Sequence, residues 1–132
     1  MKRLIAIIII VNSIFGCQNS QITEEKFRNE LRYISFNLRS VELDKIKKVS
    51  TVNGFKSLMD WSDSLSNKDF IINISKNLES GIFRYTNPKE NVFELMIDNK
   101  LENNKVVTGM ITLIVTNNRV KIEEFWGETI VY

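Results

Sequence analysis

The spacing of apolar residues changes once along the chain, near residue 82, and this change constrains the fold more than any other feature. From Thr23 to Ser80 the apolar residues recur every three or four positions, which is typical of helices that pack through one face. From Ile82 onward they alternate with polar residues, which is typical of half-buried strands. Helices followed by a run of strands predict an α+β domain in two layers, because each amphipathic element must bury its apolar side against another.

Three helices are expected in the first half of the chain. The longest, residues 23 to about 48, begins at an N-capping Thr23 and is kinked or ends near Ser40. A break over residues 51–54 precedes a second helix at 55–65, and a third begins after Ser66 or Asn67 and stops at Ser80 and Gly81. The long helix carries an apolar stripe of Phe27, Leu31, Ile34, Leu38 and Val41.

The second half of the chain predicts an antiparallel sheet of four or five strands, on which the N-terminal helices pack. The expected strands are residues 82–86, 92–98, 105–116 and 119–126, with a last short strand at 130–132. A turn is expected at residues 87–91, and Asn117-Asn118 suits a two-residue hairpin turn because Asn tolerates a positive φ.

The register of this hairpin predicts one carboxylate in an unusual place. If Asn117-Asn118 is the whole loop, Ile111 pairs with Glu124 and Gly109 pairs with Trp126. Glu124 would then share the apolar face that packs on the long helix, where an unpaired charge is costly. That face would otherwise hold Ile111, Leu113, Val115, Val120 and Ile122.

Three arrangements would relieve this cost. A β-bulge near Glu124 could turn the carboxylate outward, or Glu124 could lie at a solvated rim of the sheet. In the third arrangement Glu124 and Trp126, with a neighbouring Tyr85 or Arg84, line a polar cavity between sheet and helix. That cavity would be a ligand-binding or acid–base site.

The first seventeen residues predict where the protein resides. Lys2 and Arg3 precede an apolar run, residues 4–11, that is too short for a membrane-spanning helix of about 20 residues. A basic start, a short apolar core and a small residue before Cys17 are typical of a secretory signal peptide. Ile14-Phe15-Gly16-Cys17 resembles the lipobox of bacterial lipoproteins. A plain signal peptide with an incidental Cys and an uncleaved apolar anchor are the simpler interpretations.

The resemblance covers residues 1–17 only. It implies that the signal peptide, 1–16, is removed and that Cys17 carries fatty acyl chains such as palmitate; each buried methylene would contribute about 0.8 kcal/mol to anchoring. Residues 17–22 would be the lipidated Cys and a short tether, and 23–132 a single domain. Gln18, where Asp tends to retain such proteins at the inner membrane, favours the periplasmic side of the outer membrane in a Gram-negative cell. In other cells we expect the outer face of the cytoplasmic membrane.

Composition argues against several functions. The chain has no His, the commonest general base and metal ligand, so we predict no His-based catalysis, no ordinary zinc site and no cofactor. Loss of Lys2 and Arg3 with the signal peptide would leave 16 basic and 16 acidic side chains, which gives no electrostatic reason to expect nucleic acid as a partner.

These features predict a non-catalytic lipoprotein of the cell envelope that binds a partner near the membrane. Its contacts would be the membrane, through the lipid on Cys17, and an envelope protein or a small ligand. An inhibitor or immunity-type protein is one specific form. The alternative is a small-ligand pocket protein or weak hydrolase centred on Glu124 and Trp126, and a purely structural envelope component is a third hypothesis.

Overall fold

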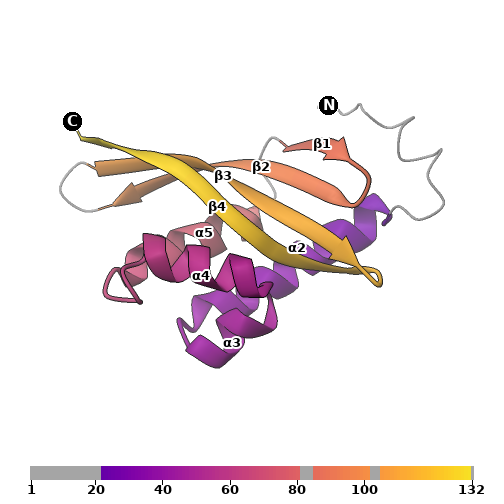
Figure 1. Cartoon of the computed structure of the whole chain (residues 1–132), viewed down its shortest axis with the longest axis horizontal. Helices are drawn as coiled ribbons and strands as arrows, with labels where there is room; N and C mark the ends of the chain where they lie inside the picture. Colours follow the sequence, from indigo (N-terminus) through magenta and orange to yellow (C-terminus); the bar gives the residue numbers. More distant parts are fainter. Residues whose placement is uncertain (1–21, 81–84, 102–104, 132) are drawn as a thin grey trace.

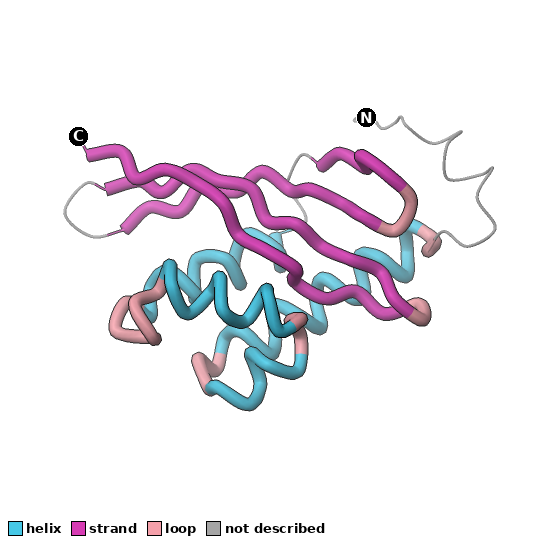
Figure 2. Tube along the Cα trace, in the orientation of Figure 1, coloured by secondary structure: helices cyan, strands magenta, loops and turns pink. Residues whose placement is uncertain are grey.

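The computed structural model describes residues 22–80, 85–101 and 105–131. In this part of the chain four helices precede a four-stranded antiparallel sheet and cover one of its faces, so the predicted α+β class is confirmed (Figure 1). Figure 2 shows the same two layers, with the helices all on one side of the strands. The predicted signal peptide, Cys17 and residues 18–21 lie outside the described residues. Ile22, assigned above to the tether, is instead buried in the core.

The long N-terminal helix ends near Ser40, as one of the two interpretations had it. Helix α2 (Glu24–Arg39) begins at Thr23, whose Oγ1 accepts a hydrogen bond from the Lys26 backbone N–H at 3.1 Å. Val41 then adopts a positive φ of 54°, a conformation uncommon for a β-branched residue, which separates α2 from the short helix α3 (Leu43–Lys48).

The second predicted helix begins earlier than expected. Helix α4 (Val52–Trp61) is capped by Thr51, whose Oγ1 accepts a hydrogen bond from the Gly54 N–H at 3.0 Å. The predicted break at 51–54 is therefore displaced to residues 49–51, the helix ends at Trp61 rather than at residue 65, and Gly54 lies inside the helix. It is needed there for packing, because a β-carbon at this position would overlap the Ile122 carbonyl oxygen of the sheet.

The third helix, α5 (Lys68–Ser80), packs beside α2. The two helices approach closely at a pair of serines, where each hydroxyl donates to the other residue's backbone carbonyl at 2.8 Å, Ser35 to Ser75 and Ser75 to Ser35. A small side chain on each helix permits this close approach, and the reciprocal bonds satisfy both buried hydroxyl groups.

The sheet has the simple order β1-β2-β3-β4, so consecutive strands are neighbours. Its strands are β1 (Tyr85–Lys89), β2 (Val92–Leu101), β3 (Lys105–Thr116) and β4 (Arg119–Val131). Asn117 and Asn118 have φ values of 53° and 63°, which confirms the predicted two-residue turn. The separate last strand is wrong, because Ile130 and Val131 continue β4, and residue 132 lies outside the described residues. The turn predicted at 87–91 is shortened to its last two residues.

The hairpin register follows the prediction only as far as Ile122. Leu113 pairs with Ile122 as expected, but Thr112 then pairs with Glu124 and Ile111 with Phe125, so Glu123 is the extra residue of a β-bulge. The predicted pairs of Ile111 with Glu124 and of Gly109 with Trp126 are therefore wrong. The extra residue reverses the two faces of β4 from Glu124 onward relative to the bulge-free register.

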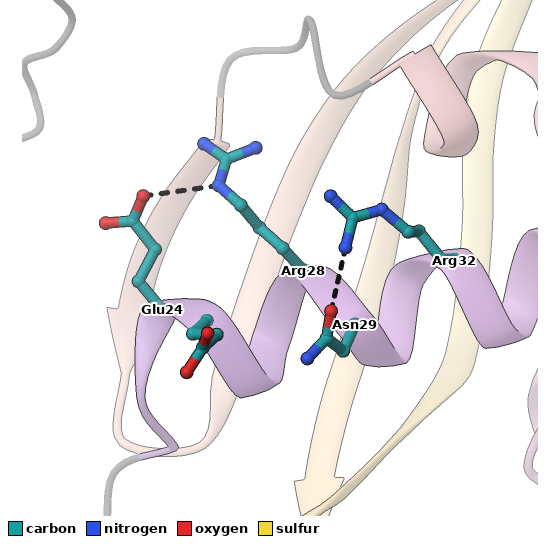
Figure 3. A pocket seen from close by; sticks show the side chains of 5 residues that line it. Glu24, Arg28, Asn29 and Arg32 are labelled. Carbon is teal, nitrogen blue, oxygen red and sulfur yellow. Dashed lines mark hydrogen bonds and ion pairs between the residues drawn. The ribbon is translucent and has the colours of Figure 1, made fainter.

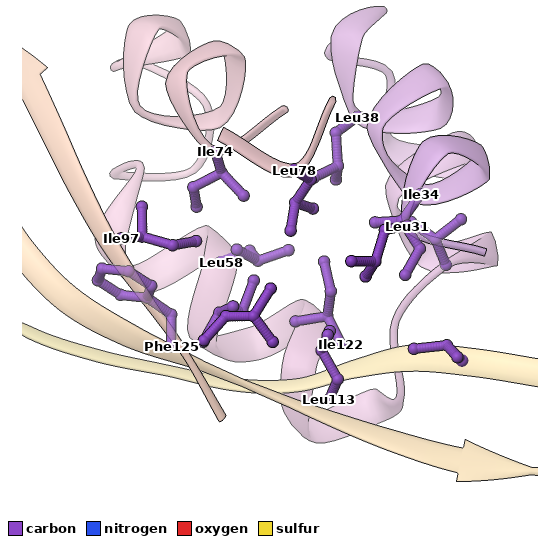
Figure 4. Close-up of a cluster of buried hydrophobic side chains, with 14 of the residues drawn as sticks. Leu31, Ile34, Leu38, Leu58, Ile74, Leu78, Ile97, Leu113, Ile122 and Phe125 are labelled. Atoms are coloured by element: carbon purple, nitrogen blue, oxygen red, sulfur yellow. The ribbon is translucent and has the colours of Figure 1, made fainter. Parts of the chain in front are cut away.

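The hydrophobic core lies between the covered face of the sheet and the helices (Figure 4). It contains the predicted strand residues of that face, and Phe125 takes the inward position opposite Ile111 that was predicted for Glu124. Phe125 contacts Phe70 edge to face, with ring centroids 5.0 Å apart. The core also holds four residues of the stripe predicted on α2: Phe27, Leu31, Ile34 and Leu38.

Candidate functional site

The face of the sheet that the helices leave open carries an exposed apolar row across three strands. The row is Met96 of β2, Met110 of β3 and Trp126 of β4, which are direct cross-strand partners. Trp126 is 63% exposed and Met96 38% exposed, and Met110 between them is partly buried. Neighbouring strands lie about 4.8 Å apart, so the row is about 10 Å wide between its outer backbones. We name these three residues the Met–Trp row.

Acidic side chains border the Met–Trp row. The adjacent cross-strand row places Glu94 and Glu124 on either side of Thr112. On the other side of the row, Glu128 follows Trp126 at the next outward position of β4 and is exposed. Glu94 accepts a hydrogen bond from the Thr86 hydroxyl at 3.4 Å. We call Glu94, Glu124 and Glu128 the carboxylate rim.

The helical layer determines which residues of β4 face outward. Ser57 of α4 clamps the backbone of Phe125: its hydroxyl donates to the Phe125 carbonyl at 3.0 Å and accepts from the Phe125 N–H at 2.9 Å. Upstream of the bulge, the Ile122 N–H donates to the Val49 carbonyl and the Thr51 N–H donates to the Ile122 carbonyl, both at 2.9 Å. With Phe125 held inward, Glu124 and Trp126 on either side of it must face outward.

The residues predicted for a cavity are not brought together by this fold. Glu124 and Trp126 are exposed on the open face instead of lying between sheet and helices. The bulge is thus the arrangement that relieves the cost of a buried Glu124. Tyr85 lies on β1, the opposite edge strand, and pairs with Leu95 of β2. Arg84 lies outside the described residues.

A buried carboxylate that the sequence analysis did not single out joins α2 to the β3–β4 hairpin. Glu30 is only 6% exposed, and its Oε1 accepts hydrogen bonds from Arg119 Nε at 2.7 Å and from the Val120 N–H at 3.0 Å. Its Oε2 lies 3.6 Å from Lys26 Nζ. Burial acts to raise the pKa of Glu30, but the Val120 hydrogen bond and the Arg119 and Lys26 charges outweigh it and lower the pKa overall.

Tyr33 extends this cluster toward solvent. The Arg119 guanidinium lies over the Tyr33 ring, 4.9 Å from its centroid, and Lys48 Nζ lies 6.0 Å from the same centroid. Desolvation acts to raise the pKa of the Tyr33 hydroxyl, whereas hydrogen bonding to Lys48 and Arg119 and their charges lower it overall. Since both Glu30 oxygens already face cationic or N–H partners, we assign the cluster to joining helix and hairpin.

A surface depression of about 440 Å³ lies along the first turns of α2 (Figure 3). Four of its five lining side chains are paired within the helix: Arg28 Nε donates to Glu24 Oε2 at 3.2 Å, and Arg32 Nη1 donates to Asn29 Oδ1 at 2.7 Å. Such exposed pairs one helical turn apart are typical of a solvated helix face. The depression therefore gives no reason to infer a ligand.

The spacing of residues in the sequence contained signals for Met96, Glu94 and Glu30, which the sequence analysis did not single out. Met96 and Glu94 alternate with the buried Phe93, Leu95 and Ile97, so they belong to the opposite face of β2. Glu30 lies three residues after Phe27 and four before Ile34, which places a charge inside the apolar stripe of α2. The spacing did not reveal which residues Met96, Glu94 and Glu30 contact, because those contacts come from other elements of the tertiary structure.

The described residues contain neither a membrane-spanning helix nor a metal-binding cluster. No helix among them has both the length and the apolar character needed to cross a bilayer. No group of three or more His, Cys, Asp or Glu side chains among them could hold a metal ion.

Comparison of the chain with protein-family models, with curated proteins and with solved structures found no match. The function has to be inferred from the chain's own residues.

Proposed function

We propose that the chain is a lipid-anchored, non-catalytic binding protein of the cell envelope, and that the Met–Trp row is the centre of its binding surface for another protein. An inhibitor or immunity-type role is one specific form of this function. The lipobox resemblance at Cys17 supports the anchor, and the exposed cross-strand row of Met96, Met110 and Trp126 supports the binding surface.

The Met–Trp row has the chemistry of an interface centre. Trp and Met are enriched in protein–protein interfaces, and Trp is among the residues that most often dominate their binding energy. Exposing an indole and two thioether side chains side by side is costly in water unless a partner covers them for part of the time. Phe36, Leu43 and Val52 are also exposed, but they come from three different helices.

The anchor is tested by metabolic labelling with radioactive palmitate in the native host. We expect the mature protein, shortened by residues 1–16, to be labelled and to sediment with membranes, and Cys17→Ala to be unlabelled. An unlabelled, full-length wild-type protein in the cytosol would refute the anchor. The matched control is Ser20→Ala, which alters a hydroxyl three residues away and leaves the lipobox intact.

The binding surface is tested by a photo-crosslinking amino acid introduced at Met96 in the full chain in the native host. Irradiation should join the protein to a partner through this position, which leaves Trp126 intact. The matched control is the same amino acid at Val52, which is 91% exposed on the helical layer and should give no product. Absence of product at Met96 from a correctly folded chain, or equal products at both positions, would refute the proposed surface.

A further inference from the structure

The carboxylate rim places negative charge around the Met–Trp row on the open face. Glu94 and Glu124 lie about 10 Å apart across three strands, and Glu128 lies beyond Trp126 on the other side of the Met–Trp row. Among the described residues none of the three is in a salt bridge, although five such pairs are formed elsewhere in that part of the chain. An apolar row is thus bordered by negative charge that the described protein does not neutralise.

The cations of this face whose side chains are described lie away from the Met–Trp row. Lys121 of β4 pairs with Ile114, and Lys89 of β1 pairs with Val92, in a cross-strand row two rows from Trp126 and Met96. The side chains between Lys121 and the Met–Trp row include Glu124, which faces the same way. A cation brought by a partner would therefore meet the carboxylates before it met a like charge.

We infer that the partner docks a cationic segment on this face, an apolar side chain against the Met–Trp row with Lys or Arg beside it for the carboxylate rim. This inference rests on the proposed function. Complementary charges steer encounter and fix register, while the desolvated apolar centre supplies most of the affinity. The exposed indole of Trp126 would also favour an Arg guanidinium, which stacks on aromatic faces.

The same charges disfavour two other occupants. Face-to-face packing of two copies of this chain would bring each carboxylate rim against its equivalent and leave like charges opposed. An anionic membrane surface would be repelled by the same three side chains. The charge of the rim thus favours a cationic protein over a second copy and over the bilayer.

The experiment uses the whole gene product, expressed, processed and lipidated in the native host, with the photo-crosslinking amino acid at Met96. Mass spectrometry maps the peptide to which position 96 is joined. The second measurement compares the crosslinking yield of Glu94→Gln/Glu124→Gln with that of a control, Glu25→Gln/Asp60→Asn. The control neutralises two exposed carboxylates of the helical layer and makes the same change in net charge.

The expected result is a joined peptide with Lys or Arg within a few residues of the crosslink and a yield that falls about tenfold in the rim variant but not in the control. An acidic or uncharged peptide, a peptide of this same chain, or equal yields in the two variants would overturn the inference while the proposed surface stands. No protein product at position 96 would instead refute the proposed surface, and this inference with it.

Discussion

The two faces of the sheet are formed by the same strands, yet their side chains have very different exposures. Phe125 and Trp126 are adjacent aromatic residues on β4: the first is 2% exposed in the core and the second is 63% exposed on the open face. Phe125 contacts rings from α4 and α5, with centroids 5.1 Å from Trp61 and 5.0 Å from Phe70. Among the described residues, no aromatic ring of the helical layer packs against Trp126. The covered face stabilises the fold, and the open face is the surface proposed for binding.

This difference depends on one extra residue, Glu123. Without the bulge, the register would turn Trp126 inward and Phe125 outward and would bury Glu124. The backbone contacts of Ile122 and Phe125 with the helical layer hold the bulge at the edge of the sheet. The interface proposed for the open face is therefore a consequence of how the helices bind the edge strand.

The largest expected effect is on the covered face. Phe125→Ala should lower the free energy of unfolding by about 3–5 kcal/mol, because it removes a buried ring and leaves a cavity between α4, α5 and the sheet. Urea unfolding followed by circular dichroism measures the change. A loss below about 1 kcal/mol would mean that Phe125 is not a core residue, and the assignment of the two faces would fail.

The next effect tests how α4 holds the bulge. Replacing a Gly inside a helix by Ala normally stabilises the helix by up to about 1 kcal/mol. At Gly54 the sign should reverse, because the added methyl would overlap the Ile122 carbonyl oxygen, and we expect Gly54→Ala to destabilise by about 3 kcal/mol. Lys56→Ala, at an exposed position of the same helix, is the control and should change stability by less than about 0.5 kcal/mol. Stabilisation by Gly54→Ala would show that α4 does not pack on the strand.

The order of elements, and much of their extent, could be predicted from the sequence because they depend on local spacing. The alternation of Val, Ile and Thr gave the bounds of β3, residues 105–116, and the two Asn residues gave the turn that follows. Gly54 was misread as a helix break, since its reason for being Gly is a carbonyl 68 positions away in the chain. Local propensity cannot reveal a contact of that kind.

The third effect concerns the link between α2 and the hairpin. At neutral pH, Glu30→Gln should cost about 1–3 kcal/mol, because it weakens a buried, charge-assisted hydrogen bond to Arg119. Glu79→Gln is the control, since Glu79 pairs with Arg39 at an exposed site and should contribute less than about 1 kcal/mol. Equal losses of unfolding free energy in the two variants would show that burial of Glu30 does not strengthen its contribution to stability.

The pH dependence of stability gives the same link a second test. The folded-state pKa of Glu30 is lowered from 4.5, so the unfolded chain takes up its proton at a higher pH than the folded chain does. Its stabilisation is then fully present above the unfolded pKa and is lost as the pH falls from about 4.5 through the folded pKa. Unfolding of wild type and Glu30→Gln measured from pH 7 to pH 3 should converge on acidification. A constant difference would contradict the lowered pKa.

The candidate surface could be predicted only in part. Glu124 was singled out because its charge conflicts with the apolar face of a bulge-free hairpin, and Trp126 because the same register placed it beside Glu124; the conflict at Glu124 was real. The conflict is relieved by a bulge rather than by a pocket. The bulge is held by the α3–α4 linker and α4, which contact the edge of β4. Tyr85 was wrongly grouped with them because the sheet order was not known, and a consecutive order puts β1 and β4 at opposite edges.

The smallest expected effect on stability is the most informative about function. Trp126→Ala removes the largest side chain on the open face but should change the free energy of unfolding by less than about 0.5 kcal/mol, because an exposed ring gains little on folding. The same variant should abolish crosslinking from Met96, since Trp would supply the largest part of the binding energy. A stability loss close to that of Phe125→Ala would mean that the indole is part of the folded core. Its exposure would then need no partner to explain it, and the functional contrast between the two faces would disappear.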